Sequence, residues 1–163
     1  MNELFGKKEL SYMKEIKRIS ENENYTAINI GRLENLNEYS LIHPKNKQEI
    51  TGKVFLKEAT DATGTEISFQ MLPPKTDLSY FHIHKQNEET YIVLKGFGDF
   101  QVDEDCFPIT EGSVVRVSPA GKRCLRNSSD ETMIYMVIQS KEDSLNQYSS
   151  ADGERVLYDP KWR

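Results

Sequence analysis

The sequence predicts an all-β fold, and two observations carry that prediction. From Val54 onward, short segments rich in β-branched and aromatic residues follow one another at even spacing, as in a β-sandwich or a β-barrel. Turn-forming residues separate these segments, including Pro73-Pro74, Gly96-Phe97-Gly98 and Pro119-Ala120-Gly121. We therefore expect a barrel of short strands.

The expected strands are apolar runs that turn residues bound on both sides. They cover residues 54–56, 66–72, 80–84, 90–94, 99–102, 106–109, 113–117, 124–126 and 133–138. The chain before the barrel is less regular. Apolar residues between Leu10 and Ile19 recur at helix-like spacing, and residues 25–30 predict a further strand.

A chain of 163 residues has room for one domain with a sizeable core. We expect residues 1–53 to form an N-terminal extension that packs on the barrel or on a dimer partner. Residues 54–140 form the expected barrel, and residues 141–163 form a C-terminal tail. The first part of the tail is polar and turn-rich, and we expect Trp162 to dock its end onto the barrel.

The charge of the chain argues against two classes of partner. Acidic residues outnumber basic ones, 26 to 21, for a formal net charge of -5, so we expect neither nucleic acid nor an anionic membrane as a partner. The first residues lack the apolar stretch of a signal peptide, and the longest apolar run, residues 133–138, is too short to span a bilayer. We therefore expect a cytoplasmic protein.

Two of the three histidines lie in His82-Ile83-His84, and Glu89 follows shortly after. Alternate residues of a strand point to one face, so the two imidazoles are presented together, and Glu89 can join them from the next strand. Glu88 is adjacent to Glu89 and faces the opposite way. Two imidazole nitrogens and one carboxylate oxygen suit a divalent transition metal, such as iron, manganese, nickel or zinc, with positions left open for water or substrate.

Other polar and aromatic residues have simpler explanations. Arg116, Arg123 and Arg126 can seat an anionic substrate, but arginines on a barrel exterior are usually solvated charges. Tyr91 and Tyr135 lie on expected strands, where aromatic residues usually pack in the core. We assign none of them a role from the sequence.

The spacing of His82, His84, Glu89 and Gly96 resembles the first motif of the cupin superfamily, and Pro119-Ala120-Gly121 resembles part of the second. The resemblance implies a small, single-domain cupin of the RmlC-like type. Its fold would be a cupin-type double-stranded β-helix, or jelly roll, barrel with an N-terminal extension, and its metal would lie inside one mouth of the barrel. It also implies a homodimer, because single-domain cupins commonly pair through exposed sheet edges.

The resemblance covers residues 66–138 and departs from the family pattern in three places. Thr76 stands where the first motif usually begins with glycine, and one extra residue precedes Pro119. Cys124 occupies the place of the histidine that usually completes the metal shell. A thiolate binds zinc or iron, which makes Cys124 a candidate fourth ligand, but a buried thiol equally packs like a small apolar residue and ligates nothing.

Three functions are compatible with these residues. The first is a metal-dependent cupin enzyme, such as a dioxygenase, an isomerase or a decarboxylase, whose metal acts on a small molecule as a Lewis acid or activates dioxygen. The second is a non-catalytic module that binds or senses a small molecule. The third is metal-free acid–base catalysis, as in jelly-roll sugar epimerases, although that chemistry needs one base and not a pair of histidines.

Overall fold

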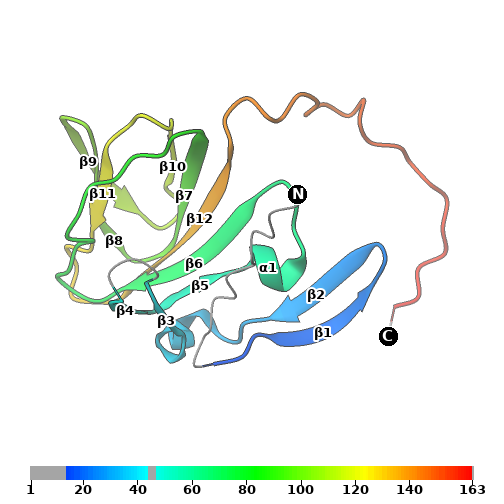
Figure 1. The fold of residues 1–163 in the computed structure, drawn as a ribbon, viewed down its shortest axis with the longest axis horizontal. Helices are drawn as coiled ribbons and strands as arrows, with labels where there is room; N and C mark the ends of the chain where they lie inside the picture. The colour runs from blue at the N-terminus through cyan, green and yellow to red at the C-terminus, as the bar shows by residue number, and fades with distance from the viewer. Residues whose placement is uncertain (1–13, 44–46, 163) are drawn as a thin grey trace, which may run out of the picture.

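The protein folds into two β-sheets that enclose a core, as seen in the computed structural model (Figure 1), which describes residues 14–43 and 47–162. The larger sheet has five strands, in the order β10 (Val114–Val117), β7 (Asn87–Lys95), β12 (Met133–Lys141), β6 (Glu66–Leu72) and β5 (Lys53–Phe55). The smaller sheet has three strands, in the order β11 (Arg123–Arg126), β8 (Phe97–Val102) and β9 (Asp105–Thr110).

Neighbouring strands in both sheets run antiparallel, which agrees with the expected all-β jelly roll. The pairings do not close into a barrel within the described residues. Strand β6 has the expected limits, whereas β7 and β12 are longer than expected. The two strands pair along almost their whole length, from Ile134 opposite Lys95 to Lys141 opposite Asn87, and this ladder continues past the apolar runs that the sequence displays.

The main core lies between the two sheets. On β7 alternate residues are buried, as expected for a strand with one face on a core. The ring of Tyr91 on β7 meets the ring of Phe100 on β8 edge to face, with centroids 4.9 Å apart. The cluster consists of Leu72, Tyr91, Val93, Phe100, Ile109, Val117, Leu125, Met133, Tyr135 and Val137.

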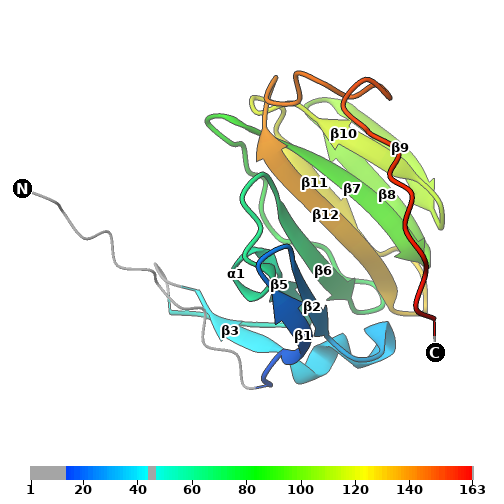
Figure 2. The same cartoon turned by 90° about the vertical axis from the view of Figure 1, so that its right-hand side faces the viewer.

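The segment before β5 begins with a hairpin of β1 (Lys17–Asn22) and β2 (Tyr25–Asn29), beside β5 and β6 in Figure 2. The helix that the apolar spacing up to Ile19 indicates is therefore absent from the described residues, and Leu10 lies outside them. Ile19 is 59% exposed, so its spacing does not mark the buried face of a helix. Cross-strand pairing with β2 supplies the backbone partners instead.

A second cluster joins this segment to the larger sheet. Leu36 belongs to the 3-10 helix η1 (Leu33–Glu38) and is buried together with Tyr39, Val54 and Ile134. A short hairpin of β3 (Ser40–Ile42) and β4 (Glu49–Thr51) follows η1, and the single-turn helix α1 (Lys57–Thr60) connects β5 to β6. The described part of the N-terminal segment thus packs on the sheet of its own chain.

Residues 80–84 do not form the strand that the sequence predicts. His82 makes one isolated bridge to Arg123, through hydrogen bonds of 3.3 and 3.2 Å between their backbones. Lys75 and Ser79 have positive φ angles of 55° and 57°, which extended strands do not contain. The residues between β6 and β7 are therefore a loop, which contacts β11 of the smaller sheet through isolated bridges from Asp77 to Arg126 and from His82 to Arg123.

The chain after β12 runs away from the two sheets (Figure 1). Trp162 is 89% exposed, so the prediction that it docks onto the barrel is wrong. Hydrogen bonds within the tail form turns, such as Asp152 N to Ser149 O, and the amide of Glu142 donates to the carbonyl of Gln86 just before β7, at 3.0 Å. No strand follows β12 among the described residues. Within the described part of the chain, no helix has both the length and the hydropathy needed to cross a bilayer.

Candidate metal centre

Two backbone contacts and one strand position His82, His84 and Glu89. The bridge to Arg123 holds His82, and the amide of His84 donates a 2.9 Å hydrogen bond to the carbonyl of Pro119. Glu89 lies on β7 and is 6% exposed, which confirms that it points inward. Alternation in an extended loop still places both histidines on the same side, although the segment is not a strand.

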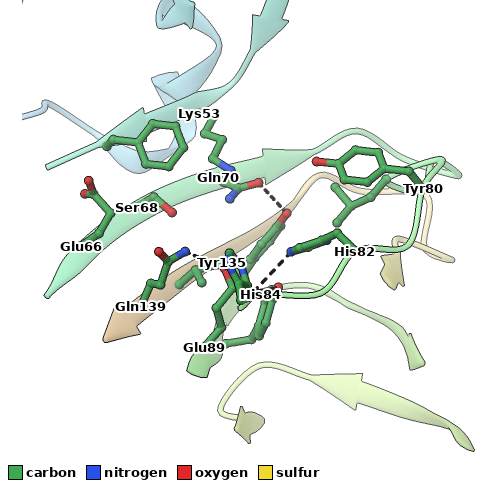
Figure 3. Close-up of a pocket in the computed structure, with 14 residues that line it drawn as sticks. Lys53, Glu66, Ser68, Gln70, Tyr80, His82, His84, Glu89, Tyr135 and Gln139 are labelled. Atoms are coloured by element: carbon green, nitrogen blue, oxygen red, sulfur yellow. Dashed lines mark hydrogen bonds and ion pairs between the residues drawn. The ribbon is translucent and has the colours of Figure 1, made fainter. Parts of the chain in front are cut away.

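The three side chains point toward one another beside strands of the larger sheet (Figure 3). His82 Nε2 lies 3.4 Å from Glu89 Oε2, and His84 Nε2 lies 3.1 Å from Glu89 Oε1. One ligand atom from each residue lies within 4.8 Å of the other two. We call His82, His84 and Glu89 the triad.

The triad fits a divalent transition metal. Atoms bonded to one metal at about 2.1 Å lie roughly 3.0–3.4 Å apart when the angle between them is right-angled to tetrahedral, and the two histidine–carboxylate distances fall in this range. Nε2 of His84 is buried and has no hydrogen-bond partner among the described residues, although a carboxylate oxygen faces it. Burial also lowers the pKa of His84, which favours the neutral imidazole that metals bind.

Glu89 is held by three further side chains. Tyr91 donates a 2.7 Å hydrogen bond to Oε2, Arg123 Nε donates to the same oxygen at 3.0 Å, and Gln139 donates to Oε1 at 3.2 Å. Burial alone would raise the pKa of the Glu89 carboxyl, but the contacts with His82 and Tyr91 and the charges of His84 and Arg123 outweigh it and hold the pKa below its usual value. The carboxylate is therefore ionised and fixed in orientation.

The sequence did not distinguish Arg123 from Arg116 and Arg126, but the structure does. Its side chain is 1% exposed and forms an ion pair with Glu89, whereas Arg116 pairs with Glu88 and Arg126 with Asp99 at the surface. Nη1 of Arg123 also donates to the carbonyls of Gly121 and Pro119, at 2.7 and 3.2 Å. No periodicity distinguishes this arginine from the two exposed ones; the bridge to the His82 backbone sets which face of β11 it occupies.

Cys124 is not brought together with the triad. On β11 the residues Arg123 and Leu125 are buried, and Cys124 between them is half-buried. Its side chain lines a different cavity, together with Cys106 and Arg126. Burial raises the pKa of its thiol, which disfavours the thiolate that a metal binds. The position of Cys124 therefore gives no support to its role as a ligand.

Asn127 fills a structural role at the end of β11. Its side-chain amide donates to the carbonyls of Leu72, Pro73 and Glu131, at 2.9, 3.0 and 2.7 Å. It is 1% exposed and ties the two loops at this end of the sheets together.

The triad lines a cavity of about 200 Å³, bounded by strands of the larger sheet and by the loop between β6 and β7. This volume lies below the roughly 300–1,000 Å³ of pockets that hold drug-sized ligands, so the cavity suits a smaller molecule. The other lining residues are Lys53, Phe55, Glu66, Ser68, Gln70, Leu78, Tyr80, Tyr91, Tyr135, Val137 and Gln139. Lys53 was not singled out from the sequence, because a lone lysine beside Val54 carries no pattern.

Residues 68–139 match the model of the cupin domain. A cupin protein from Bacteroides fragilis, known from its crystal structure, is 34% identical, with a TM-score of 0.63, over 69% of this chain and 99% of that one. The chain belongs to the cupin family. No curated protein matches this cupin at a significant level.

Two other solved structures resemble this cupin in fold. A predicted oxalate decarboxylase from Thermotoga maritima is 23% identical, with a TM-score of 0.51, over 58% of this chain and 83% of that one. A sugar phosphate isomerase of the cupin superfamily from Silicibacter pomeroyi is 18% identical, with a TM-score of 0.50, over 55% of this chain and 60% of that one. At such identities the likeness extends to the fold alone.

Proposed function

We propose that this cupin is a metal-dependent enzyme that acts on a small molecule, with His82, His84 and Glu89 as the metal ligands. One observation carries the proposal: two imidazole nitrogens and a carboxylate converge within 4.8 Å of one another on the wall of a cavity of about 200 Å³. A donor set of this kind leaves coordination positions free for substrate or water. The cavity supplies a concave site with several polar side chains, as small-molecule sites usually have.

A divalent metal bound here would act as a Lewis acid on a substrate oxygen or as an activator of dioxygen. The surrounding residues prepare the ligands for it. Tyr91 and Gln139 fix the two oxygens of Glu89 by hydrogen bonds, and Arg123 offsets the charge of the carboxylate. Tyr135 donates a 2.8 Å hydrogen bond to Gln70, which orders the part of the cavity wall formed by β12 and β6. Such outer partners orient metal ligands and adjust their affinity.

Metal-free acid–base catalysis is the second candidate, because the rings of Tyr80 and His82 lie with their centroids 5.7 Å apart in the same cavity. In that reaction His82 would remove a proton and Tyr80 would return one. Burial raises the pKa of Tyr80, which keeps its hydroxyl protonated. A non-catalytic binding module would use the same cavity without turnover.

Elemental analysis by mass spectrometry separates these candidates. We expect stoichiometric iron, manganese, nickel or zinc in protein purified without chelator, and none in a His82→Ala/His84→Ala variant. His43→Ala is the matched control, because it removes the remaining histidine, which does not line the cavity and does not belong to the triad. No bound metal in the parent, even after reconstitution, would contradict the proposal and leave the metal-free reaction. Retention by the double variant would place the metal elsewhere.

A substitution of Cys124 tests whether its thiol is a fourth ligand. Cys124→Ser should leave the metal affinity unchanged if the thiol lies outside the shell, and should reduce it strongly if the thiolate ligates. Competition with a coloured zinc chelator measures the affinity of both proteins.

We also propose that the cupin is a homodimer. Strands β10 and β5 are the edges of the larger sheet, and Val114 on β10 is 63% exposed. An edge strand that no other strand covers favours pairing between chains, and β10 is the better candidate because the N-terminal segment packs beside β5. Sedimentation equilibrium should give twice the mass of one chain, and the mass of a single chain would contradict the dimer.

A further inference from the structure

Lys53 extends from the edge strand β5 into the cavity that the triad lines (Figure 3). It lies opposite Gln70 of β6 in the ladder, so its strand position is set by pairing within the sheet. Its ammonium lies over the ring of Phe55, 4.5 Å from the centroid, a cation–π contact that holds the head group in place. Lys53 on β5 and Glu89 on β7 belong to the same sheet, and the side chain of Lys53 presents a positive charge to the cavity.

Among the residues that the structure describes, no acidic side chain forms an ion pair with Lys53. Within residues 14–43 and 47–162, no carboxylate oxygen lies within 4.0 Å of its ammonium. The two carboxylates that line the cavity are engaged elsewhere. Glu66 accepts hydrogen bonds from the amides of Leu56 and Lys57, at 3.0 and 2.9 Å, and Glu89 is paired with Arg123.

Moving an unpaired charge out of water costs free energy, so a buried or half-buried lysine usually has a counter-ion. Burial lowers the pKa of Lys53 to about 8, and at neutral pH the ammonium form still predominates. Around the cavity the two acidic groups balance Lys53 and Arg123. A divalent metal on the triad would therefore give the cavity a net positive charge, which an anionic ligand would offset.

We propose that Lys53 binds the oxyanion group, a carboxylate or a phosphate, of a small anionic substrate whose second oxygen faces the triad. This inference rests on the function proposed above and names its substrate class. The cavity of about 200 Å³ suits a small substrate, and Lys53 and the triad, which both line it, would contact the anionic end and the reacting end of that substrate. Lys53 is thus a specificity-determining residue that touches the substrate away from the metal.

Paired ligands that differ in charge test the assignment. Glycolate and glycolamide have similar shape and the same hydroxyl group, but only glycolate carries a carboxylate. We expect the zinc-loaded parent to bind glycolate at least about tenfold more tightly than glycolamide by isothermal titration calorimetry, since hydrogen bonds to charged groups are the strong ones. Lys53→Met should lose this preference, and Lys53→Arg should keep part of it. Lys57→Met is the matched control, because Lys57 is exposed on α1 and does not line the cavity.

Inorganic phosphate forms the second arm of the test. Phosphate that binds more tightly than glycolate, in a Lys53-dependent manner, identifies a phosphate as the oxyanion, and the reverse order identifies a carboxylate. An unchanged glycolate preference in Lys53→Met, or no measurable binding of either anion to the parent, overturns the proposal. Far-ultraviolet circular dichroism confirms that Lys53→Met is folded, and Lys53→Gln replaces it if it is not.

Metal content separates this proposal from the one on which it rests. Each variant is analysed for zinc, and the titrations are repeated on chelator-treated protein. If the parent takes up no zinc but Lys53 still sets the preference for anions, the metal-dependent function fails and the oxyanion site stands. If zinc is stoichiometric and Lys53→Met binds glycolate like the parent, the metal site stands and the role of Lys53 fails.

Discussion

Arg123→Met removes the positive charge beside Glu89 and keeps an unbranched apolar side chain of similar reach. The variant loses the 3.0 Å ion pair with Glu89 and the donors to the carbonyls of Gly121 and Pro119. Glu89 stays buried and keeps its hydrogen bonds from Tyr91 and Gln139. The substitution therefore leaves a buried carboxylate that is hydrogen-bonded but without a counter-charge.

Breaking a buried ion pair by removing one partner costs about 3–5 kcal/mol. The remaining donors to Glu89 favour the lower end, so we expect a loss of about 3 kcal/mol in the free energy of unfolding of the metal-free protein. For a chain of this length each kcal/mol shifts the melting temperature by about 2–4 °C, which gives a decrease of roughly 6–12 °C. Differential scanning calorimetry of chelator-treated protein measures it.

A bound divalent metal should restore much of this loss, because it supplies the positive charge that Glu89 has lost. The rise in melting temperature on adding zinc should therefore be larger for Arg123→Met than for the parent. Arg126→Met is the control on the same strand: its ion pair with Asp99 is at the surface, so its removal should cost about 0–1 kcal/mol. A metal-free Arg123→Met protein as stable as the parent would refute the reasoning, as would a smaller response to zinc.

Three further outcomes follow from the same contacts. The pKa of Glu89 is lower in the folded state than in the unfolded state, where it is near 4.5. The ionised carboxylate therefore stabilises the fold fully above about pH 4.5, and this contribution is lost as the pH falls through the pKa of the folded state. In chelator-treated protein, Glu89→Gln should flatten the decline in stability to urea below about pH 4.5. Tyr91→Phe removes a donor to that carboxylate and should cost about 1.5–3 kcal/mol in urea unfolding, whereas an unchanged midpoint would mean that the hydrogen bond is not formed in solution. A Cβ at Gly98 would lie 2.0 Å from the carbonyl oxygen of Arg126, whereas a Cβ at Gly64 would meet nothing within 4 Å. Gly98→Ala should therefore lower the free energy of unfolding by about 1–3 kcal/mol or more, and Gly64→Ala should not. Equal melting temperatures for the two variants would contradict this packing.

Much of the sheet structure could be predicted from local patterns. The limits of β6 agree with the apolar run of residues 66–72, because pleated strands with one buried face leave an alternating pattern and turn residues bound them. The expected strand at residues 80–84 failed for a different reason. His82 and His84 alternate as strand residues do, but positive φ angles at Lys75 and Ser79 direct this segment away from a continuous ladder.

The sequence by itself determined the family resemblance, the pairing of His82 with His84 on one side and the inward direction of Glu89, since each depends on residue type and on a period of two. Only the tertiary structure decided which residue of β11 meets Glu89. That choice depends on the bridge between the backbones of His82 and Arg123, which join segments about forty residues apart, and a shift of one residue would exchange Arg123 for Cys124. Lys53 likewise reaches the cavity only because β5 pairs with β6, a long-range contact that leaves no local signal in the chain.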